Sequence, residues 1–511
     1  MSNADSVLVD GRSLSLEQFL AVARHGRSVA LPAEARTRIA ASRTSVERAV
    51  AAGRAVYGVT TGFGGLSHKM ITPAQSRELQ VSLVRSHASG TGPALPTDVV
   101  RGLVLLRANS LARGHSGVRP EVVERLLDLL NRGLVPWIPE QGSVGASGDL
   151  APLAHLAMTL LGEGAFVGPS ADAPEPARRL LEREGISPLE LVEKEGVALL
   201  NGTALMASYL ALAVADVRGL LDAALVAAAV SFDALEGNPE SLDDRLGEIR
   251  NFPEHRAVAA ALRALLAGTS LSAPRTTWMG QDAYTLRCLP QVLGSVELGL
   301  HFAEGIVVRE LNAVTDNPVV FAGDEFVSGG NFHGQPLALA LDTLAVATQY
   351  LAAFSERRTS RLLHPALNRG LPAFLAPDPG VSSGFMVPQY LAAALVNENV
   401  TLGHPASVSS LPTSADQEDY VSMGPWAGVK LRRIVENTRR VLAVEWIVSA
   451  QALELRHPRT GGRGSEAALA AVRSRVASWT HDRSPAADIA RVTDDLASGG
   501  LVGAVRALVP F

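Results

Sequence analysis

Apolar residues recur at helical spacing over most of the chain beyond residue 205. Between residues 289 and 315 the steps are three and four, and the run stops at Asp316-Asn317-Pro318. Its apolar positions after Leu289 are Leu293, Val296, Leu300, Ala303 and Ile306. This spacing predicts an amphipathic helix that ends at or before the proline.

Two further long helices are predicted by the same pattern. One begins at Pro336 and continues toward Glu356, and another covers residues 428–456. The apolar face of the first comprises Leu337, Leu341, Leu344, Thr348 and Leu351. All three helices are well above the usual mean of about 11 to 12 residues. Helices of that length favour a bundle.

The most apolar stretch, residues 204–237, carries charged residues at Asp216, Arg218, Asp222 and Asp233. A membrane-spanning helix needs about 20 nearly uncharged residues, so we predict a buried helix of a soluble protein. The preceding residues combine short helical patterns with glycine-rich loops.

The predicted fold is mainly α, with a long central helix bundle. Residues 1–203 form a smaller N-terminal mixed region, and residues 204–511 form the bundle and the C-terminal helices. No Pro/Ser-rich linker separates them, so we expect one interwoven body. Wide apolar stripes on long helices are often covered by other subunits, which predicts a homo-oligomer.

Composition and charge narrow the class of protein. Hydrophobic residues make up 47% of the chain and aromatic residues only 5%, which excludes disorder and favours closely packed helices. The net charge of -5 includes no basic block, which argues against a nucleic-acid partner. The single Cys288 forbids an internal disulfide, and the opening residues lack a signal-peptide pattern. We expect a cytoplasmic protein.

The segment with the most chemical information is residues 142–156, GSVGASGDLAPLAHL. Its first half has almost no side-chain bulk, so the backbone can fold tightly. It leads into a helix, with Asp149 placed to cap it and Pro152 tolerable in its first turn. A bare run of this kind is often an ordinary glycine-rich loop.

The whole segment resembles the signature of the aromatic amino-acid ammonia-lyase and aminomutase family. In that family an Ala-Ser-Gly triplet, here Ala146-Ser147-Gly148, cyclises autocatalytically with loss of two waters to 4-methylideneimidazole-5-one (MIO). The resemblance implies a fumarase/aspartase-like fold and a homotetramer with intersubunit active sites. It also implies an aromatic amino acid as substrate and no metal or diffusible cofactor.

Other segments between residues 50 and 456 resemble the same family. Residues 57–64 are similar to its inner lid loop, which implies Tyr57 as the base for the substrate β-proton and Gly64 as a substrate-binding residue. Residues 199–203 resemble the segment whose asparagine, here Asn201, hydrogen-bonds the cofactor and the substrate.

The later blocks imply a further set of site residues. Residues 281–288 are similar to the block that carries a second tyrosine and the carboxylate-binding arginine. Residues 331–334 resemble the stretch flanking the cofactor, and residues 417–423 the stretch facing the substrate ring or amine. The residues so implied are Gln281, Tyr284, Arg287, Asn331, Phe332, Glu418 and Tyr420. We interpret the Asp316-Asn317-Pro318 stop as structural, and residues 355–358 as an intersubunit charge cluster.

In the family, the pair of positions matching Ser86-His87 mainly distinguishes the substrates. Ser86-His87 resembles the pair in histidine ammonia-lyases and in bacterial tyrosine lyases and 2,3-aminomutases. Histidine can hydrogen-bond an imidazole or a phenol. Tyr420, Gly334, Gln335 and Ala283 depart from the usual histidine-lyase pattern, whereas Glu418 agrees with it. We favour L-tyrosine, giving p-coumarate or β-tyrosine, over L-histidine, giving urocanate, and over another β-aryl amino acid.

Lyase and aminomutase share these residues, so the sequence leaves the two reactions open. Two rival classes also remain. One is a helical-bundle lyase of the fumarase and aspartase type without an internal cofactor, and the other is a non-catalytic helical scaffold. The Ala146-Ser147-Gly148 triplet distinguishes the first, and the effect of replacing Tyr57 or Ser147 distinguishes the second.

Overall fold

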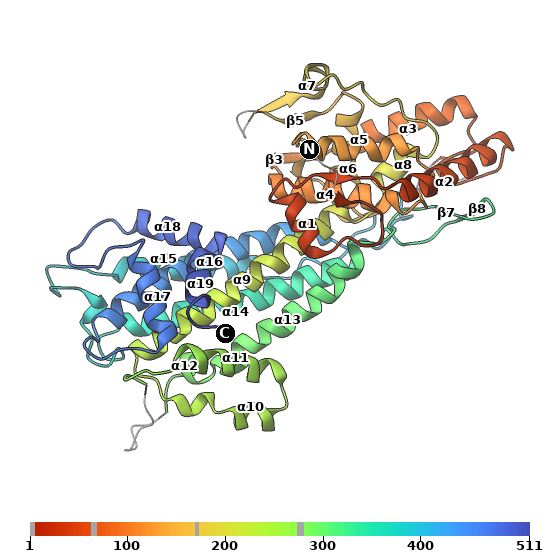
Figure 1. Ribbon diagram of the computed structural model, residues 1–511. Coiled ribbons are helices and arrows are strands. Elements are labelled where there is room, and N and C mark those ends of the chain that lie inside the picture. The colour runs from red at the N-terminus through yellow and green to blue at the C-terminus, as the bar shows by residue number, and fades with distance from the viewer. Residues whose placement is uncertain (1–5, 63–68, 169–172, 273–280) are drawn as a thin grey trace. The chain divides into compact units, whose positions relative to one another are not determined.

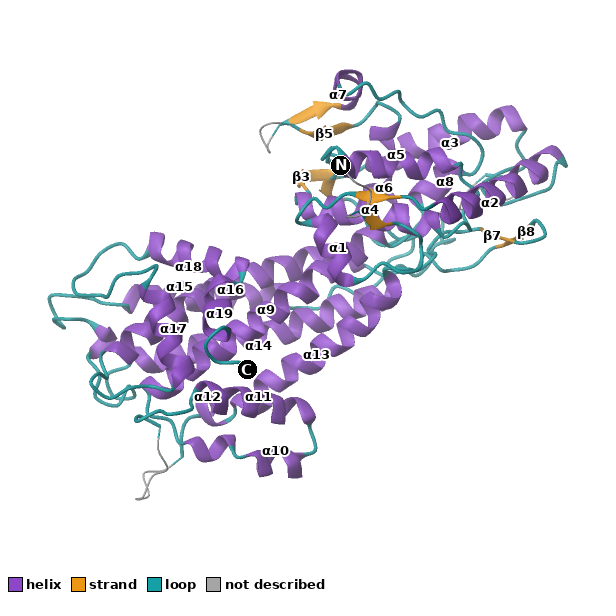
Figure 2. Cartoon of the chain, viewed as in Figure 1, coloured by secondary structure: helices purple, strands orange, loops and turns teal. Residues whose placement is uncertain are grey.

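The computed structural model describes residues 6–62, 69–168, 173–272 and 281–511. Helices dominate, and the strands form short two-stranded pairs (Figures 1 and 2). The prediction of a mainly α fold is therefore confirmed. The chain divides into two compact units. Unit 1 comprises Met1–Leu212, Glu304–Asp342 and Pro405–Val429, and unit 2 comprises Ala213–Ala303, Thr343–His404 and Lys430–Phe511. The division at residue 203 stays a prediction.

Unit 1 contains short helices and all of the named strands. Its helices are α1 (Leu16–Ala23), α2 (Ala33–Ala51), α3 (Pro73–His87), α4 (Thr97–Ala112), α5 (Pro120–Asn131), α6 (Leu150–Leu160), α7 (Ala177–Arg183) and α8 (Glu195–Leu200). Its strand pairs are β1 (Val7–Leu8) with β2 (Val29–Ala30), β3 (Thr91–Ala94) with β4 (Pro139–Gln141), β5 (Ala165–Val167) with β6 (Pro174–Pro176), and β7 (Val319–Phe321) with β8 (Glu325–Val327). The first pair is parallel and the others are antiparallel.

Helix α4 is the centre of unit 1, because every residue from Val99 to Ala112 is buried. Helices α1 and α5 pack against it. The apolar stripe of α5 supplies Val122, Leu126 and Leu130 to this core. Helix α3 begins with a capping box of Thr72 and Gln75 and packs on both α6 and α8. These three helices frame the candidate site.

Unit 2 is helical throughout its named elements. They are η3 (Pro239–Leu242), α10 (Asp244–Arg250), α11 (Pro253–Leu265), α12 (Tyr284–Arg287), η4 (Ala373–Leu375), α15 (Met386–Leu402), α17 (Arg463–Arg473), α18 (Ala486–Ser498) and α19 (Gly500–Arg506). Four longer helices contribute residues to both units. They are α9 (Ala204–Ala234), α13 (Leu289–Glu310), α14 (Gln335–Leu363) and α16 (Gly424–Glu454).

The four long helices confirm the helical predictions. The first predicted helix ends earlier than its pattern suggested, at Glu310 rather than next to Asp316. Asn312 gives the reason, because its side chain accepts from the Leu14 amide and donates to the Leu14 carbonyl, both at 2.9 Å. A side chain that satisfies another segment's backbone competes with continuation of its own helix.

Part of the predicted intersubunit charge cluster lies inside this chain instead. Arg358 is fully buried, and its Nε and Nη2 atoms donate to Glu445 Oε1 and Oε2 at 2.5 and 2.8 Å. Ser231 also donates to Glu445 Oε1, at 2.7 Å. This buried group ties α9, α14 and α16 together in unit 2, so for Arg358 the intersubunit interpretation was wrong. A buried guanidinium needs a nearby carboxylate, and α16 supplies it.

Within the described residues, two helices are long and apolar enough to cross a membrane by length and composition. They are α13 and α14, with mean hydropathy of 1.2 and 1.5 in their most apolar windows. Of those windows, 39% and 61% are buried inside the protein. Core helices of soluble proteins satisfy the same test.

Candidate functional site

A cavity of about 390 Å³ in unit 1 brings together several of the predicted site residues. Its predicted members are Tyr57, His87, Ser147, Asn201 and Glu418. The rest of its lining consists of Gly62, Leu79, Ser82, Leu83, Ser86, Leu150, Val197, Leu200 and Ser414. The apolar part of this wall was not predicted. The sequence contained a signal for it, because Leu79, Leu83 and Ser86 are spaced so that they share one face of the α3 helix with the predicted His87.

His87 is the last residue of α3, and its ring has a defined hydrogen-bonding state. Its Nδ1 atom lies 2.9 Å from the Leu83 carbonyl, and a carbonyl can only accept, so Nδ1 carries the proton. The Ser86 hydroxyl lies 3.0 Å from the same nitrogen. Burial lowers the pKa of His87, although the Leu83 contact and the charge of Glu418 partly oppose the shift. The neutral ring therefore offers Nε2 as a hydrogen-bond acceptor.

Glu418 is held by a tight hairpin. Its backbone amide and carbonyl pair with those of Thr413, at 3.2 and 2.9 Å. The Thr413 hydroxyl also donates to the Glu418 carboxylate at 3.0 Å. Between them, Ser414, Ala415 and Asp416 all have positive φ, which gives the turn its shape. The cavity thus contains two acceptors of different kinds, a carboxylate and a neutral imidazole.

The Ala146-Ser147-Gly148 triplet forms a tight turn next to the Asn201-Gly202 backbone. The Gly148 amide donates to the Gly145 carbonyl at 3.2 Å, and Ser147 has a φ of 47°. The Ser147 carbonyl accepts from the Gly202 amide at 3.1 Å. A Cβ on Gly148 would lie 2.1 Å from the Gly202 carbonyl oxygen. Only glycine fits this close approach.

That geometry agrees with the requirement of the cyclised triplet. Cyclisation joins backbone atoms two residues apart and so needs a tight turn without side-chain obstruction, and the Gly148–Gly145 hydrogen bond and the positive φ of Ser147 mark a tight turn here. Ala146 and Gly148 are buried, whereas Ser147 lines the cavity. The residues present therefore fit the group that the family resemblance implies.

Asp149 makes a different contact from the one predicted. It occupies the N-cap position of α6, yet its side chain forms no capping bond there. Its Oδ2 atom instead accepts from the amides of Leu205 and Met206, at 2.7 and 3.3 Å, and so caps the start of α9. Burial raises the pKa of Asp149 to about 7. The prediction of a cap on its own helix was wrong, because tertiary contact brings a second helix start closer.

Asn201 is positioned by buried charged groups behind the cavity. Its Nδ2 atom donates to the Asn317 carbonyl at 2.8 Å, and the Asn201 backbone carbonyl accepts from Arg107. Lys194 and Asp316, both fully buried, form an ion pair of 2.7 Å beside them. Burial lowers the pKa of Lys194 and of Arg107. The Asp316-Asn317-Pro318 segment is therefore more than a helix stop, because it holds the asparagine amide.

Besides Ala146 and Gly148, three predicted residues of unit 1 lie outside the lining of this cavity. Asn331 lines another cavity, of about 420 Å³, and donates to the Val314 carbonyl at 3.3 Å. Phe332 is half-buried. Tyr420 is 57% exposed and stacks on His333, with 6.2 Å between the ring centroids. Tyr420 therefore does not line the cavity with His87, as the proposed phenol contact required.

The remaining predicted residues are distributed differently. Gln281, Tyr284 and Arg287 belong to unit 2, where Tyr284 is 66% exposed and Arg287 is half-buried. Gly64 lies outside the described residues. In the part of the chain that the structure describes, no group of three or more His, Cys, Asp or Glu side chains could hold a metal ion.

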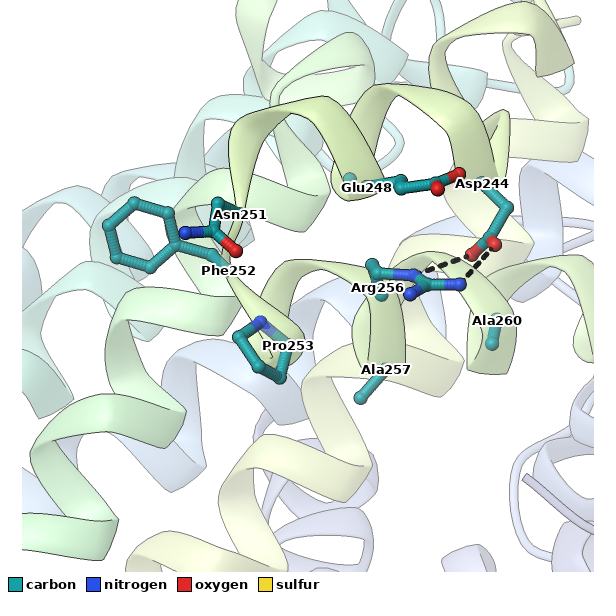
Figure 3. A pocket seen from close by; sticks show the side chains of 9 residues that line it. Asp244, Glu248, Asn251, Phe252, Pro253, Arg256, Ala257 and Ala260 are labelled. Carbon is teal, nitrogen blue, oxygen red and sulfur yellow. Dashed lines mark hydrogen bonds and ion pairs between the residues drawn. The ribbon is translucent and has the colours of Figure 1, made fainter.

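A larger surface cavity of about 480 Å³ lies between α10 and α11 of unit 2 (Figure 3). Its only basic lining residue, Arg256, already pairs with Asp244, and the shortest contact is 2.6 Å. Glu248, Asn251 and Phe252 complete the polar and aromatic part of the lining. The lining of this cavity includes none of the predicted site residues, so the Tyr57 cavity is the better candidate.

Replacing Gly202 by alanine is expected to destabilise the protein by about 2 to 4 kcal/mol. Gly202 has a φ of 141°, and an added Cβ would lie 2.6 Å from both Arg107 Nη1 and Thr315 Oγ1. Urea unfolding measures the change. Gly219→Ala is the matched control, because Gly219 has open space around it within α9 and alanine favours a helix. Equal stability of the Gly202→Ala variant and the wild type would contradict the close packing of this backbone.

Comparison with known proteins identifies the family. Residues 14–474 match the family described as aromatic amino acid lyase. The histidine ammonia-lyase of Deinococcus radiodurans is 50% identical over 97% of this chain and 94% of its own length. That of Sorangium cellulosum is 49% identical over 98% and 99%.

Solved structures agree. The tyrosine aminomutase of Streptomyces globisporus has a TM-score of 0.94 and 37% identity, covering 99% of both chains. The histidine ammonia-lyase of Trypanosoma cruzi has a TM-score of 0.91 and 40% identity, covering 99% of this chain and 96% of its own. The chain therefore belongs to the aromatic amino acid lyase family and is a carbon-nitrogen lyase, as its sequence motifs predicted.

Proposed function

We propose that the protein eliminates ammonia from L-histidine and releases urocanate. The observation that carries this proposal is the pair of acceptors in the cavity, His87 Nε2 and the Glu418 carboxylate. A substrate imidazole held against the Glu418 carboxylate is favoured in its protonated form, which carries two N–H donors and one positive charge, whereas a phenol carries a single O–H donor and no charge. A polar site rejects a ligand that leaves one of its buried groups unpaired. The similarity to histidine ammonia-lyases of about 50% identity supports the same substrate.

The second candidate is the one that the sequence analysis favoured, a tyrosine ammonia-lyase or 2,3-aminomutase. The similarity to the tyrosine aminomutase of Streptomyces globisporus supports it, and His87 could accept a hydrogen bond from a phenol. Tyr420, however, does not line the cavity and so adds no second partner for a para-hydroxyl. Histidine is therefore the better proposal, and the tyrosine preference is revised.

The roles of this chain's residues follow from their positions and from the family. Tyr57, at the cavity wall, accepts the β-proton of the substrate. Asn201, held through its amide by Asn317, presents its side-chain oxygen as an acceptor. Arg287 binds the substrate carboxylate, since its planar fork matches two oxygens.

The cofactor that we propose is MIO, formed from Ala146-Ser147-Gly148. It would supply an electrophilic carbon for the substrate amine, which no ordinary side chain provides. The Gly202 backbone would hold it through the contact to the Ser147 carbonyl. Gln281, Tyr284, Asn331, Phe332 and Gly64 remain proposed site residues through the family resemblance.

We also propose a cytoplasmic homotetramer whose active sites combine residues of several subunits. Tyr284 is exposed in the single chain although the resemblance places it in the site, and a neighbouring chain would cover it. Apolar side chains exposed on α13 and α15 support extensive assembly. They include Phe302, Val308, Val387, Tyr390 and Val400.

Incubation of the purified protein with L-histidine is expected to yield urocanate, and L-tyrosine is expected to yield neither coumarate nor β-tyrosine. Ultraviolet absorbance follows the first two products and chromatography follows the third.

Glu418→Gln should raise KM for histidine or lower kcat by about 10- to 1000-fold, because one acceptor for the imidazole becomes partly a donor. Thr413→Val, which removes only the contact behind Glu418, should have a smaller effect. Turnover of tyrosine without urocanate formation would replace this proposal by the second candidate.

A further inference from the structure

Asp282 joins three separate segments of unit 2 through one buried carboxylate. Its Oδ2 atom accepts from the Asn238 backbone amide at 2.6 Å. Its Oδ1 atom accepts from Arg369 Nη2 at 2.7 Å. The Asp282 side chain is only 2% exposed. A buried carboxylate with two charge-compatible donors fixes the position of its own backbone.

The segments that contain Asn238 and Arg369 are themselves fixed by further hydrogen bonds. Arg369 also donates to the Glu236 carbonyl at 3.1 Å. Arg456 donates to the Arg369 and Asn368 carbonyls, at 3.1 and 3.0 Å. The two segments that donate to the Asp282 carboxylate, residues 236–238 and 368–369, are thus tied to each other and to Arg456, just after α16. Asp282 is the point at which the 281–288 block attaches to this framework.

Arg287 takes its orientation from the backbone of the same aspartate. Its Nε atom donates to the Asp282 carbonyl at 2.8 Å. Its guanidinium carbon lies 4.5 Å from the centroid of the Tyr284 ring. Among the described residues, no acidic side chain forms an ion pair with Arg287. With Nε engaged, the two terminal Nη groups remain as the edge that can hold a carboxylate bidentately.

We propose that Asp282 is the positioning residue for carboxylate recognition, because it fixes the backbone carbonyl that aims the Arg287 fork. This inference rests on the proposed function, in which Arg287 binds the carboxylate of the amino acid. A guanidinium that rotates about its last bonds loses the in-plane match to two oxygens. Loss of the Asp282 carboxylate should therefore weaken the binding of ligands that carry a carboxylate and leave the binding of ligands without one unchanged.

The test compares two ligands that differ only in the carboxylate. They are 3-(imidazol-4-yl)propionate and 4-ethylimidazole, measured as inhibitors of the intact enzyme and by direct binding. The first variant, Asp282→Asn, keeps the shape of the side chain but places an amide against the two donors. The second, Arg369→Gln, removes the ion pair with Asp282 through the more exposed of the two partners. Arg459→Gln is the matched control. It breaks a 2.8 Å pair with Glu236 in the same loop region and has no contact with Asp282 among those described.

For both variants, the affinity for the propionate should fall by at least about tenfold, because small misplacement of an orienting group costs that much or more. The affinity for 4-ethylimidazole should change by less than about twofold, and the control should match the wild type. Equal weakening of both ligands would show a general structural role and overturn the proposal. Unchanged affinity for both ligands would overturn it as well, as would a wild type without preference for the carboxylate.

The same experiment separates this inference from the proposed function. If the wild type forms urocanate and the two affinities move together, the inference fails and the function stands. If the wild type processes tyrosine instead, the function fails, and 3-(4-hydroxyphenyl)propionate against 4-ethylphenol decides the inference in the same way. Melting curves show which variants are folded. The milder Arg369→Gln variant provides the comparison if Asp282→Asn unfolds.

Discussion

Replacing Ser147 by alanine is expected to lower turnover by at least about three orders of magnitude. In the proposed cofactor, the serine would supply the hydroxyl that is lost as water when the triplet becomes an electrophile, and alanine has none. The surrounding turn should survive, because its contacts are backbone bonds of Gly145, Gly148 and Gly202. Intact mass and steady-state turnover are the two measurements. The wild-type mass should be lower than that of its sequence by two waters, and the variant mass should equal that of its sequence.

Ser143→Ala is the control for this result. Ser143 lies in the same loop and accepts a weak hydrogen bond from the Gly145 amide at 3.4 Å, yet it is outside the triplet. This variant should keep both the reduced mass and the activity. A wild type with the full sequence mass would refute the cofactor proposal, and an active Ser147→Ala variant would refute its role in the reaction. The rival lyase without an internal cofactor predicts that full mass.

Tyr57→Phe is expected to reduce kcat by about 10² to 10⁴-fold, the usual contribution of a positioned acid or base. The change removes one oxygen from the cavity wall and keeps the ring, so substrate affinity should change much less. The reduced intact mass should persist, because the tyrosine is not part of the triplet. This combination of lost turnover and retained mass distinguishes a proton-transferring group from one needed for cofactor formation.

A matched substitution outside the cavity lining provides the comparison for Tyr57→Phe. Tyr350, on α14 of unit 2, is 42% exposed, and Tyr350→Phe should leave kcat unchanged. The non-catalytic scaffold hypothesis predicts no turnover in the wild type and no difference between these variants. Full activity of Tyr57→Phe would remove the tyrosine from the proposed mechanism and leave the family assignment intact.

The buried charges beside Asn201 illustrate what local sequence cannot reveal. Lys194 precedes α8, and Asp316 lies 122 residues later in a segment that reads as a helix stop. Neither position has a local pattern that predicts a partner. Burial of both charges is tolerable only because each neutralises the other. Asp316 is adjacent to Asn317, whose carbonyl accepts from the Asn201 amide, so the pair is part of the tertiary surroundings of the site.

Periodicity determined the long helices, because apolar residues at steps of three and four can be buried together only on a helix. The Ala146-Ser147-Gly148 triplet was identified through the resemblance of residues 142–156 to a family signature, and its small side chains allow the backbone to fold tightly. Both signals are local in sequence, and the structure has the long helices and a tight turn at the triplet. The end of α13 at Glu310 was missed because Asn312 bonds to Leu14, which lies almost 300 positions earlier.

The substrate choice depended on contacts between distant segments. From sequence alone, His87 and Tyr420 both offered a hydrogen bond to a phenol, and Glu418 offered one to an imidazole. Only the tertiary structure places Glu418 in the cavity with His87 and turns Tyr420 toward His333. The sequence by itself determined the helices, because these follow from local spacing, and it indicated the triplet and the family through short motifs that resemble the family's. The folded chain decided which side chains share a cavity, because that depends on how residues far apart in sequence pack together.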